Sequence, residues 1–155
     1  MVANAKIRAR GLAMIVAIFA GATVAADIGQ LKVVKGTVTV ERGGQPISAV
    51  VGTPVQAGDV VRTGANASVG ITMVDDTLLS AGPNSVLMLD RLDYDPSMRS
   101  GRLDATLRTG TLAVVSGRIA KQSPEAMTVR TPLAILGVRG TEFAVSAHDP
   151  VLAKP

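Results

Sequence analysis

The chain has 155 residues, a formal net charge of +4, 47% hydrophobic and 2% aromatic residues, and no cysteine. This length suits a single domain with a substantial core, and the hydrophobic content argues against a disordered chain. Without cysteine there is no disulfide, thiolate metal site or cysteine nucleophile, and one histidine, His148, leaves little basis for a histidine metal cluster or for catalysis.

Residues 1–26 are predicted to be a signal peptide. Three basic residues precede an uncharged apolar stretch from Gly11 to Ala26, and Val24 and Ala26 are small residues at the positions that signal peptidase reads. We expect cleavage after Ala26 and export to the periplasm. A retained anchor is the alternative, but this stretch is shorter than the ~20 residues of a membrane span, so no stable span is expected after cleavage.

Removing the leader changes the charge balance. The leader carries three of the sixteen basic residues and no acidic residue, which leaves thirteen basic against twelve acidic residues. The remaining bases are scattered and have no aromatic platform beside them, so we expect no nucleic-acid partner.

Short strands and frequent turns predict an all-β domain over residues 27–147, followed by a tail at 148–155. Apolar and polar side chains alternate, as in half-buried strands, over residues 34–41, 67–73, 102–108 and 142–147. Residues 84–95 form the longest stretch free of glycine and proline; they fit a strand buried on both faces, with helix left open for the second half. Turns are expected at Gly43-Gly44, Gly58-Asp59, residues 63–66 and 82–84, Thr109-Gly110 and Gly117.

The scarcity of aromatic residues bears on the architecture. Only Tyr94 and Phe143 remain after the leader, whereas sandwiches and ligand barrels usually fill a thick core with aromatic side chains. A thin core of valine, leucine, isoleucine and alanine therefore favours a compact β-solenoid or β-roll-like domain, with a β-sandwich as the alternative.

The order of the turns resembles the periplasmic domain of the FecR family over about residues 32–147. The resemblance rests on Gly58-Asp59-Val60-Val61-Arg62-Thr63, Asp75-Asp76-Thr77, Gly110-Thr111-Leu112, Thr131-Pro132-Leu133-Ala134 and the closing run from Gly137 to Val145. Asp76 stands where the family usually has glycine. The motif residues, for which we expect a structural role, are Gly58, Asp59, Thr63, Asp75, Thr131, Pro132, Gly137, Arg139, Gly140, Thr141 and Phe143.

The resemblance implies a non-enzymatic periplasmic domain that binds an envelope protein or assists envelope assembly, because FecR-like regulators sense the signalling domain of an outer-membrane transporter. Only ten residues precede the apolar stretch, so the family's cytoplasmic anti-sigma role does not carry over. The alternative is a signalling component of siderophore or iron uptake that works with a separate sigma-factor or transporter partner.

Two segments are weighed as ligand sites. Gly137 and Gly140 around Arg139 suit an anion-binding loop, or a tight turn in which Arg139 pairs with Glu142 or Asp59. Asp90, Asp93 and Asp95 suit a calcium loop, or a solvated turn after a strand. We prefer the turn over the ligand site for both segments, since neither has the residue spacing of a known ligand-binding loop. We expect no metal, no cofactor and no catalytic residue.

Overall fold

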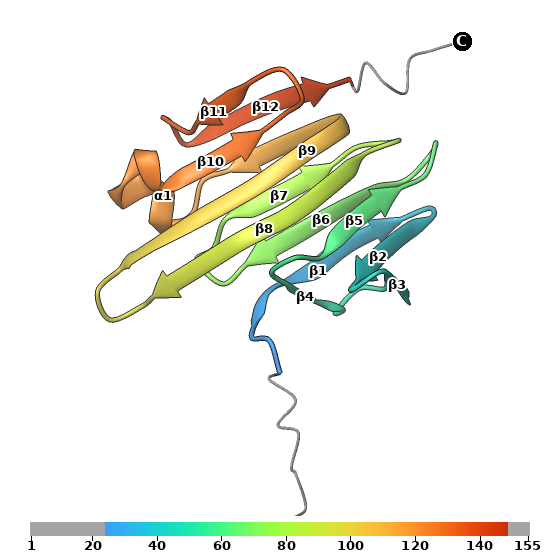
Figure 1. The fold of residues 1–155 in the computed structure, drawn as a ribbon, viewed down its shortest axis with the longest axis horizontal. Coiled ribbons are helices and arrows are strands. Elements are labelled where there is room, and N and C mark those ends of the chain that lie inside the picture. Colours follow the sequence, from blue (N-terminus) through green and yellow to red (C-terminus); the bar gives the residue numbers. More distant parts are fainter. Residues whose placement is uncertain (1–23, 149–155) are drawn as a thin grey trace, which may run out of the picture.

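The computed structural model describes residues 24–148, which form an all-β domain with one short helix (Figure 1). Residues 1–23 of the predicted leader and residues 149–155 of the predicted tail lie outside the described residues. The strands are β1 (Asp27–Lys35), β2 (Val38–Arg42), β3 (Gln45–Ser48), β4 (Pro54–Gln56), β5 (Val60–Thr63), β6 (Ser68–Met73), β7 (Leu78–Ala81), β8 (Val86–Asp95), β9 (Ser100–Val115), β10 (Met127–Arg130), β11 (Ile135–Gly137) and β12 (Glu142–Ala147). Helix α1 spans Arg118–Gln122, and a 3₁₀ turn follows at Pro124–Ala126.

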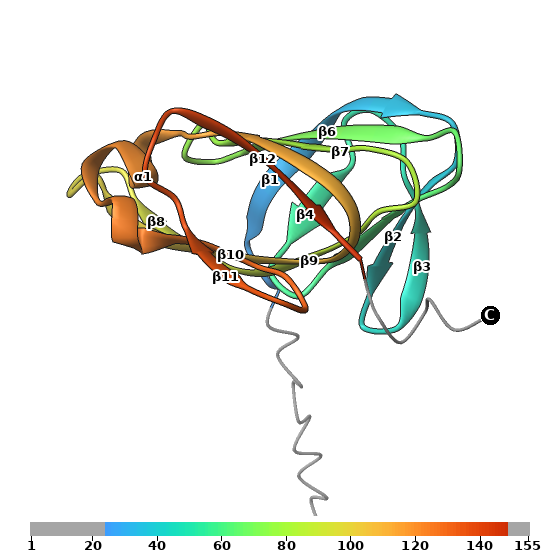
Figure 2. The same ribbon diagram turned by 90° about the horizontal axis from the view of Figure 1, so that it is seen from above.

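Two sheets share strand β9. The first half of β9 pairs with β8 and β10, and its second half pairs with β7 and β12. The β1 sheet therefore runs β4-β1-β6-β7-β9-β12, and the β8 sheet runs β3-β2-β5-β8-β9-β10-β11. Figure 2 shows β9 curving from one layer into the other, so the strands form one curled, half-barrel sheet.

The strand pairing does not confirm a solenoid or roll. Neighbouring strands are antiparallel except β9 and β10. The all-β class is confirmed, and the shape is that of a curled, half-barrel sheet whose inner face surrounds the core.

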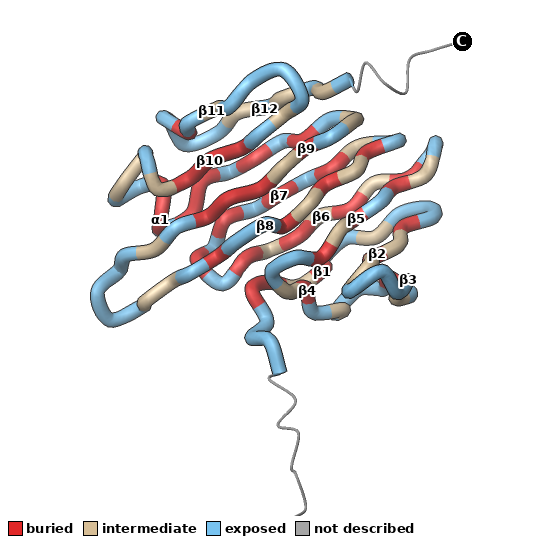
Figure 3. The backbone as a smooth tube through the Cα atoms, viewed as in Figure 1, coloured by how far each residue is buried: buried red, intermediate tan, exposed pale blue. Residues whose placement is uncertain are grey.

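The core lies between the two layers and is aliphatic, as predicted. Buried and exposed residues alternate along the strands (Figure 3). The largest fully buried side chains are leucine, isoleucine, methionine and valine, and Tyr94 and Phe143 only pack against the edge of the core. Neither aromatic residue of the described chain belongs to the fully buried set, so the interior is filled by aliphatic side chains.

Several predicted elements are confirmed and others are wrong. Strands β6 and β12 lie where the alternation placed them, and residues 84–95 contain strand β8 and no helix. The burial on both faces predicted for that strand is wrong, because buried and more exposed side chains alternate along its first half. The strand predicted over residues 34–41 breaks at Gly36, whose φ of 69° turns the chain from β1 into β2. The turn predicted at Thr109-Gly110 is wrong, because β9 continues through it. Among the described residues, no helix is long and apolar enough to span a membrane.

Candidate functional site

The bend of β9 is fixed by a hydrogen-bonded corner that contains the motif residue Thr63. The Thr63 hydroxyl donates to the carbonyl of Gly82 (2.6 Å) and accepts from the amide of Ser85 (2.9 Å). The amide of Thr111 donates in turn to the Ser85 hydroxyl oxygen (3.1 Å). Gly110 has a φ of 95°, and a Cβ atom there would lie 2.5 Å from the Cα of Ser85. The corner thus requires a glycine, and it carries β9 from one sheet to the other.

The motif residue Asp59 is buried and forms a bidentate ion pair with Arg42. Arg42 Nε donates to Oδ1 (2.9 Å) and Nη2 donates to Oδ2 (2.8 Å), while the amide of Gln56 also donates to Oδ2 (2.9 Å). The hydrogen bond to Asp59 raises the pKa of Arg42. The preceding Gly58 has a φ of 90°, and its amide donates to the carbonyl of Leu89 (2.6 Å). These contacts tie β2, β4 and β8 together, a structural role.

The motif residue Asp75 is fully buried and joins the β6–β7 turn to α1. Its carboxylate accepts from the amide of Thr77 (3.1 Å), the hydroxyl of Thr77 (2.7 Å) and the amide of Ile119 (3.3 Å). The backbone amide of Arg118 donates to the Asp75 carbonyl (2.8 Å), and that of Gly117 donates to Thr77 Oγ1 (3.1 Å). A carboxylate from a distant turn therefore caps the first turn of α1, which has no side-chain cap of its own.

Asp76, which departs from the family pattern, has left-handed backbone geometry. Its φ is 66°, a conformation that glycine adopts without strain and aspartate tolerates better than most residues. Its carboxylate forms an ion pair with Arg118 across the junction (2.8 Å). The turn keeps the shape that a glycine would allow, and the added carboxylate gains a partner on α1.

The first half of the closing motif forms the β10–β11 turn. The amide of Thr131 donates to the carbonyl of Ala134 (2.8 Å), and the Thr131 hydroxyl oxygen accepts from the Ala134 amide (3.1 Å). Pro132 lies exposed within this turn, and Gly137 ends β11. Val138 is buried, and its amide donates to the carbonyl of Met127 (3.2 Å).

The second half leads into β12. The carbonyl of Gly140 accepts from the Ser116 hydroxyl (2.9 Å), and that of Thr141 accepts from the Ser116 amide (2.8 Å). Phe143 packs against the rim of the core.

The pairing considered for Arg139 is not found. Asp59, one of the two candidate partners, is engaged by Arg42, and no ion pair joins the exposed Arg139 to Glu142 within residues 24–148. A Cβ atom at Gly137 or Gly140 would meet nothing within 4 Å, so no crowded cradle surrounds the loop. The structure supports neither the anion loop nor the predicted ion pair.

The three candidate calcium ligands have separate partners. The hydroxyl of Thr106 donates to Asp90 Oδ2 (2.6 Å), and Asp93 pairs with Arg91. Asp95 closes the β8–β9 turn by accepting from nearby hydroxyl and amide groups, and the hydroxyl of Ser97 is the main cause that lowers its pKa. In the part of the chain that the structure describes, no three carboxylates or imidazoles gather as a metal site.

Partners of the motif residues were missed from the sequence. Arg42, Ser85 and Ser116 lie 17, 22 and 25 positions from Asp59, Thr63 and Thr141, and no local pattern connects them. The general rule that a buried carboxylate requires a cation or several hydrogen-bond donors was the available indication that such partners exist.

Comparison with known protein families identifies the segment that contains most of these motif residues. A family model described as FecR protein matches residues 59–153, well over half of the chain, and includes the Asp59, Asp75 and closing segments. Curated proteins and solved structures gave no match. The family suggests a domain related to signalling or regulation and is typically associated with the cell envelope. The chain belongs to the FecR family.

Proposed function

We propose that the protein is an exported, non-enzymatic FecR-type domain that binds an envelope protein in the periplasm, and that the partner adds a strand to β12. The observation that carries the proposal is the open edge of β12. This strand pairs with β9 on one side and with no described strand on the other. An open edge presents unpaired amide and carbonyl groups, which a partner strand can bind.

The backbone groups that face the open edge follow from the pairing with β9. The carbonyl of Thr141 accepts from the amide of Ser116, the residue directly after β9 (2.8 Å), so the backbone groups of Thr141 point toward the β9 chain. These groups alternate along an antiparallel strand, and the register shows no bulge. The amides and carbonyls of Glu142, Ala144 and Ser146 therefore point to the open edge.

The edges formed by β3, β4 and β11 are less suited to strand addition. Strand β11 has three residues, and β3 and β4 are short and contain Pro46 and Pro54. Short strands and prolines are common means of blocking an edge. Strand β12 has six residues and contains no proline, lysine or arginine. The sequence of β12 therefore lacks the proline and lysine residues that commonly block strand addition at an edge.

A proline at position 144 tests the proposal, because it removes an amide that β9 does not use. We expect Ala144→Pro to fold and to lose the envelope partner that the tagged wild-type protein captures from an envelope extract. Ala144→Thr keeps the amide and is the matched control that retains the partner. Equal capture by both variants would contradict strand addition at β12, and recovery of no partner would count against a binding module.

Family membership favours one alternative, a signalling component of siderophore or iron uptake with a separate sigma-factor or transporter partner. The two functions differ in the partner. Direct binding of the purified protein to the isolated signalling domain of an outer-membrane transporter would favour the alternative. Capture of a peptidoglycan-binding or secretion protein would favour the assembly module.

A further inference from the structure

A polar cleft lies between the β8–β9 turn and α1, and none of its lining residues belongs to β12. It is lined by Tyr94, Pro96, Arg99, Arg118 and Gln122 and has a volume of about 360 Å³. This volume is at the lower end of the range for small-molecule sites, about 300–1,000 Å³. None of the lining residues belongs to the family motif described above.

The side chains that line this cleft are mainly hydrogen-bond donors. Arg99 and Arg118 each carry a guanidinium, which stays protonated at any physiological pH. The Tyr94 hydroxyl oxygen is buried and has no hydrogen-bond partner in the described structure. An unpaired buried hydroxyl is costly, so a ligand oxygen that bound near it would relieve that cost.

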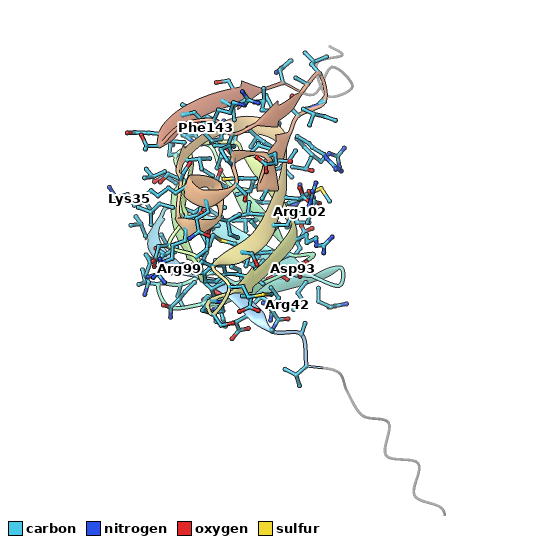
Figure 4. The ribbon with its side chains drawn as sticks, turned by 90° about the vertical axis from the view of Figure 1, so that its left-hand side faces the viewer. Lys35, Arg42, Asp93, Arg99, Arg102 and Phe143 are labelled. Atoms are coloured by element: carbon cyan, nitrogen blue, oxygen red, sulfur yellow. The ribbon has the colours of Figure 1, made fainter. Side chains whose placement is uncertain are left out.

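The nearby acidic groups leave the Arg99 guanidinium without an ion-pair partner among the described residues. Asp76 pairs with Arg118 (2.8 Å), and Asp95 faces the groups of its own turn. Arg99 is exposed, with a φ of 50°, and forms no ion pair with any described residue. Figure 4 shows Arg99 on the opposite side of this end of the domain from Asp93 and Arg102. The Arg99 guanidinium is therefore available to an anionic ligand in the cleft.

We propose that this cleft binds a small organic ligand through its phosphoryl group. A phosphoryl group presents several acceptor oxygens and a negative charge, which match two guanidinium groups and a phenol hydroxyl. Pro96 supplies an apolar wall and Gln122 an amide for the organic part of the ligand. The ligand is either a soluble phosphate ester or a phospholipid headgroup, which present the same chemistry.

Calorimetry with glycerol 3-phosphate tests the site, with glycerol as the uncharged control. We expect saturable binding that Arg99→Ala weakens about tenfold or more. Arg130→Ala removes another exposed charge, from β10, and should leave the affinity unchanged. No binding of glycerol 3-phosphate, or equal losses in the two variants, would overturn the proposal, because equal losses indicate general attraction between charges.

Two further variants separate binding from folding. Tyr94→Phe removes only the unpartnered hydroxyl, so it should leave the melting temperature unchanged or raise it while it weakens binding severalfold. Asp76→Asn removes the carboxylate that competes for Arg118 and should strengthen binding. Unchanged affinity in both variants would contradict the assigned cleft.

Vesicles distinguish the two ligand sources. Sedimentation with phosphatidylglycerol vesicles, but not with phosphatidylcholine vesicles, and its loss in Arg99→Ala would assign the cleft to a lipid headgroup. Binding of glycerol 3-phosphate without such sedimentation would assign it to a soluble ester.

Discussion

Replacing Asp75 with alanine tests whether the β6–β7 turn holds α1 in place. The carboxylate is fully buried and accepts three hydrogen bonds, from the amide and hydroxyl of Thr77 and the amide of Ile119. The substitution leaves these donors without that acceptor in the interior. The Thr77 hydroxyl keeps its contact with the amide of Gly117 (3.1 Å), and the bond from Ile119 is long at 3.3 Å.

The substitution therefore leaves the buried amide of Thr77 without an acceptor and weakens the hydrogen bonding of the Thr77 hydroxyl and the Ile119 amide. At about 1–3 kcal/mol for each unsatisfied buried group, we expect a loss of about 3 kcal/mol in the free energy of unfolding. For a domain of this size, the melting temperature should fall by roughly 10 °C.

Urea unfolding followed by circular dichroism measures this loss. The matched control is Asp90→Ala, which removes an exposed carboxylate with one hydroxyl partner and should cost less than about 1 kcal/mol. A loss at Asp75 as small as that at Asp90 would refute the assigned role of the buried carboxylate.

Three other predictions concern the backbone and pH. Gly110→Ala should cost about 3–5 kcal/mol, because its positive φ disfavours a side chain and the new Cβ would overlap Ser85; wild-type stability in urea would refute this. Asp76→Gly should raise the free energy of unfolding by about 0.5–1 kcal/mol, since relief of left-handed strain exceeds the loss of an exposed ion pair; a lowered melting temperature would contradict it. The pKa of Asp95 is lowered, chiefly by the hydrogen bond from the Ser97 hydroxyl. The ionised carboxylate therefore stabilises the turn at a pH above the ordinary carboxyl pKa, and this stabilisation is lost as the pH falls through the lowered pKa. NMR titration of the Asp95 carboxyl should give a midpoint below that of a model peptide.

The sequence was informative where the signal is local. Alternation predicted β6 and β12, because each lies in a sheet with one face toward the core and one toward solvent. The small number of aromatic residues predicted an aliphatic core, because the buried positions then have to be filled by aliphatic side chains.

The errors arose where distant residues decide the local structure. Gly110 reads as a turn, yet its positive φ serves a bend inside a strand because Ser85 occupies the space beside it. The helix at Arg118–Gln122 has only five residues and depends on a carboxylate more than 40 positions away. The proposed phosphate cleft likewise combines two arginines from separate elements, and no spacing rule relates them.

The central claim is that a partner adds a strand to the open edge of β12, and amide hydrogen exchange tests it most directly. In the free protein, the amides of Phe143 and Val145 should exchange slowly because they face β9, and those of Ala144 and Ser146 should exchange fast. On binding of the captured partner, the account predicts that Ala144 and Ser146 become protected. Bound partner with unchanged fast exchange at these two amides would contradict it.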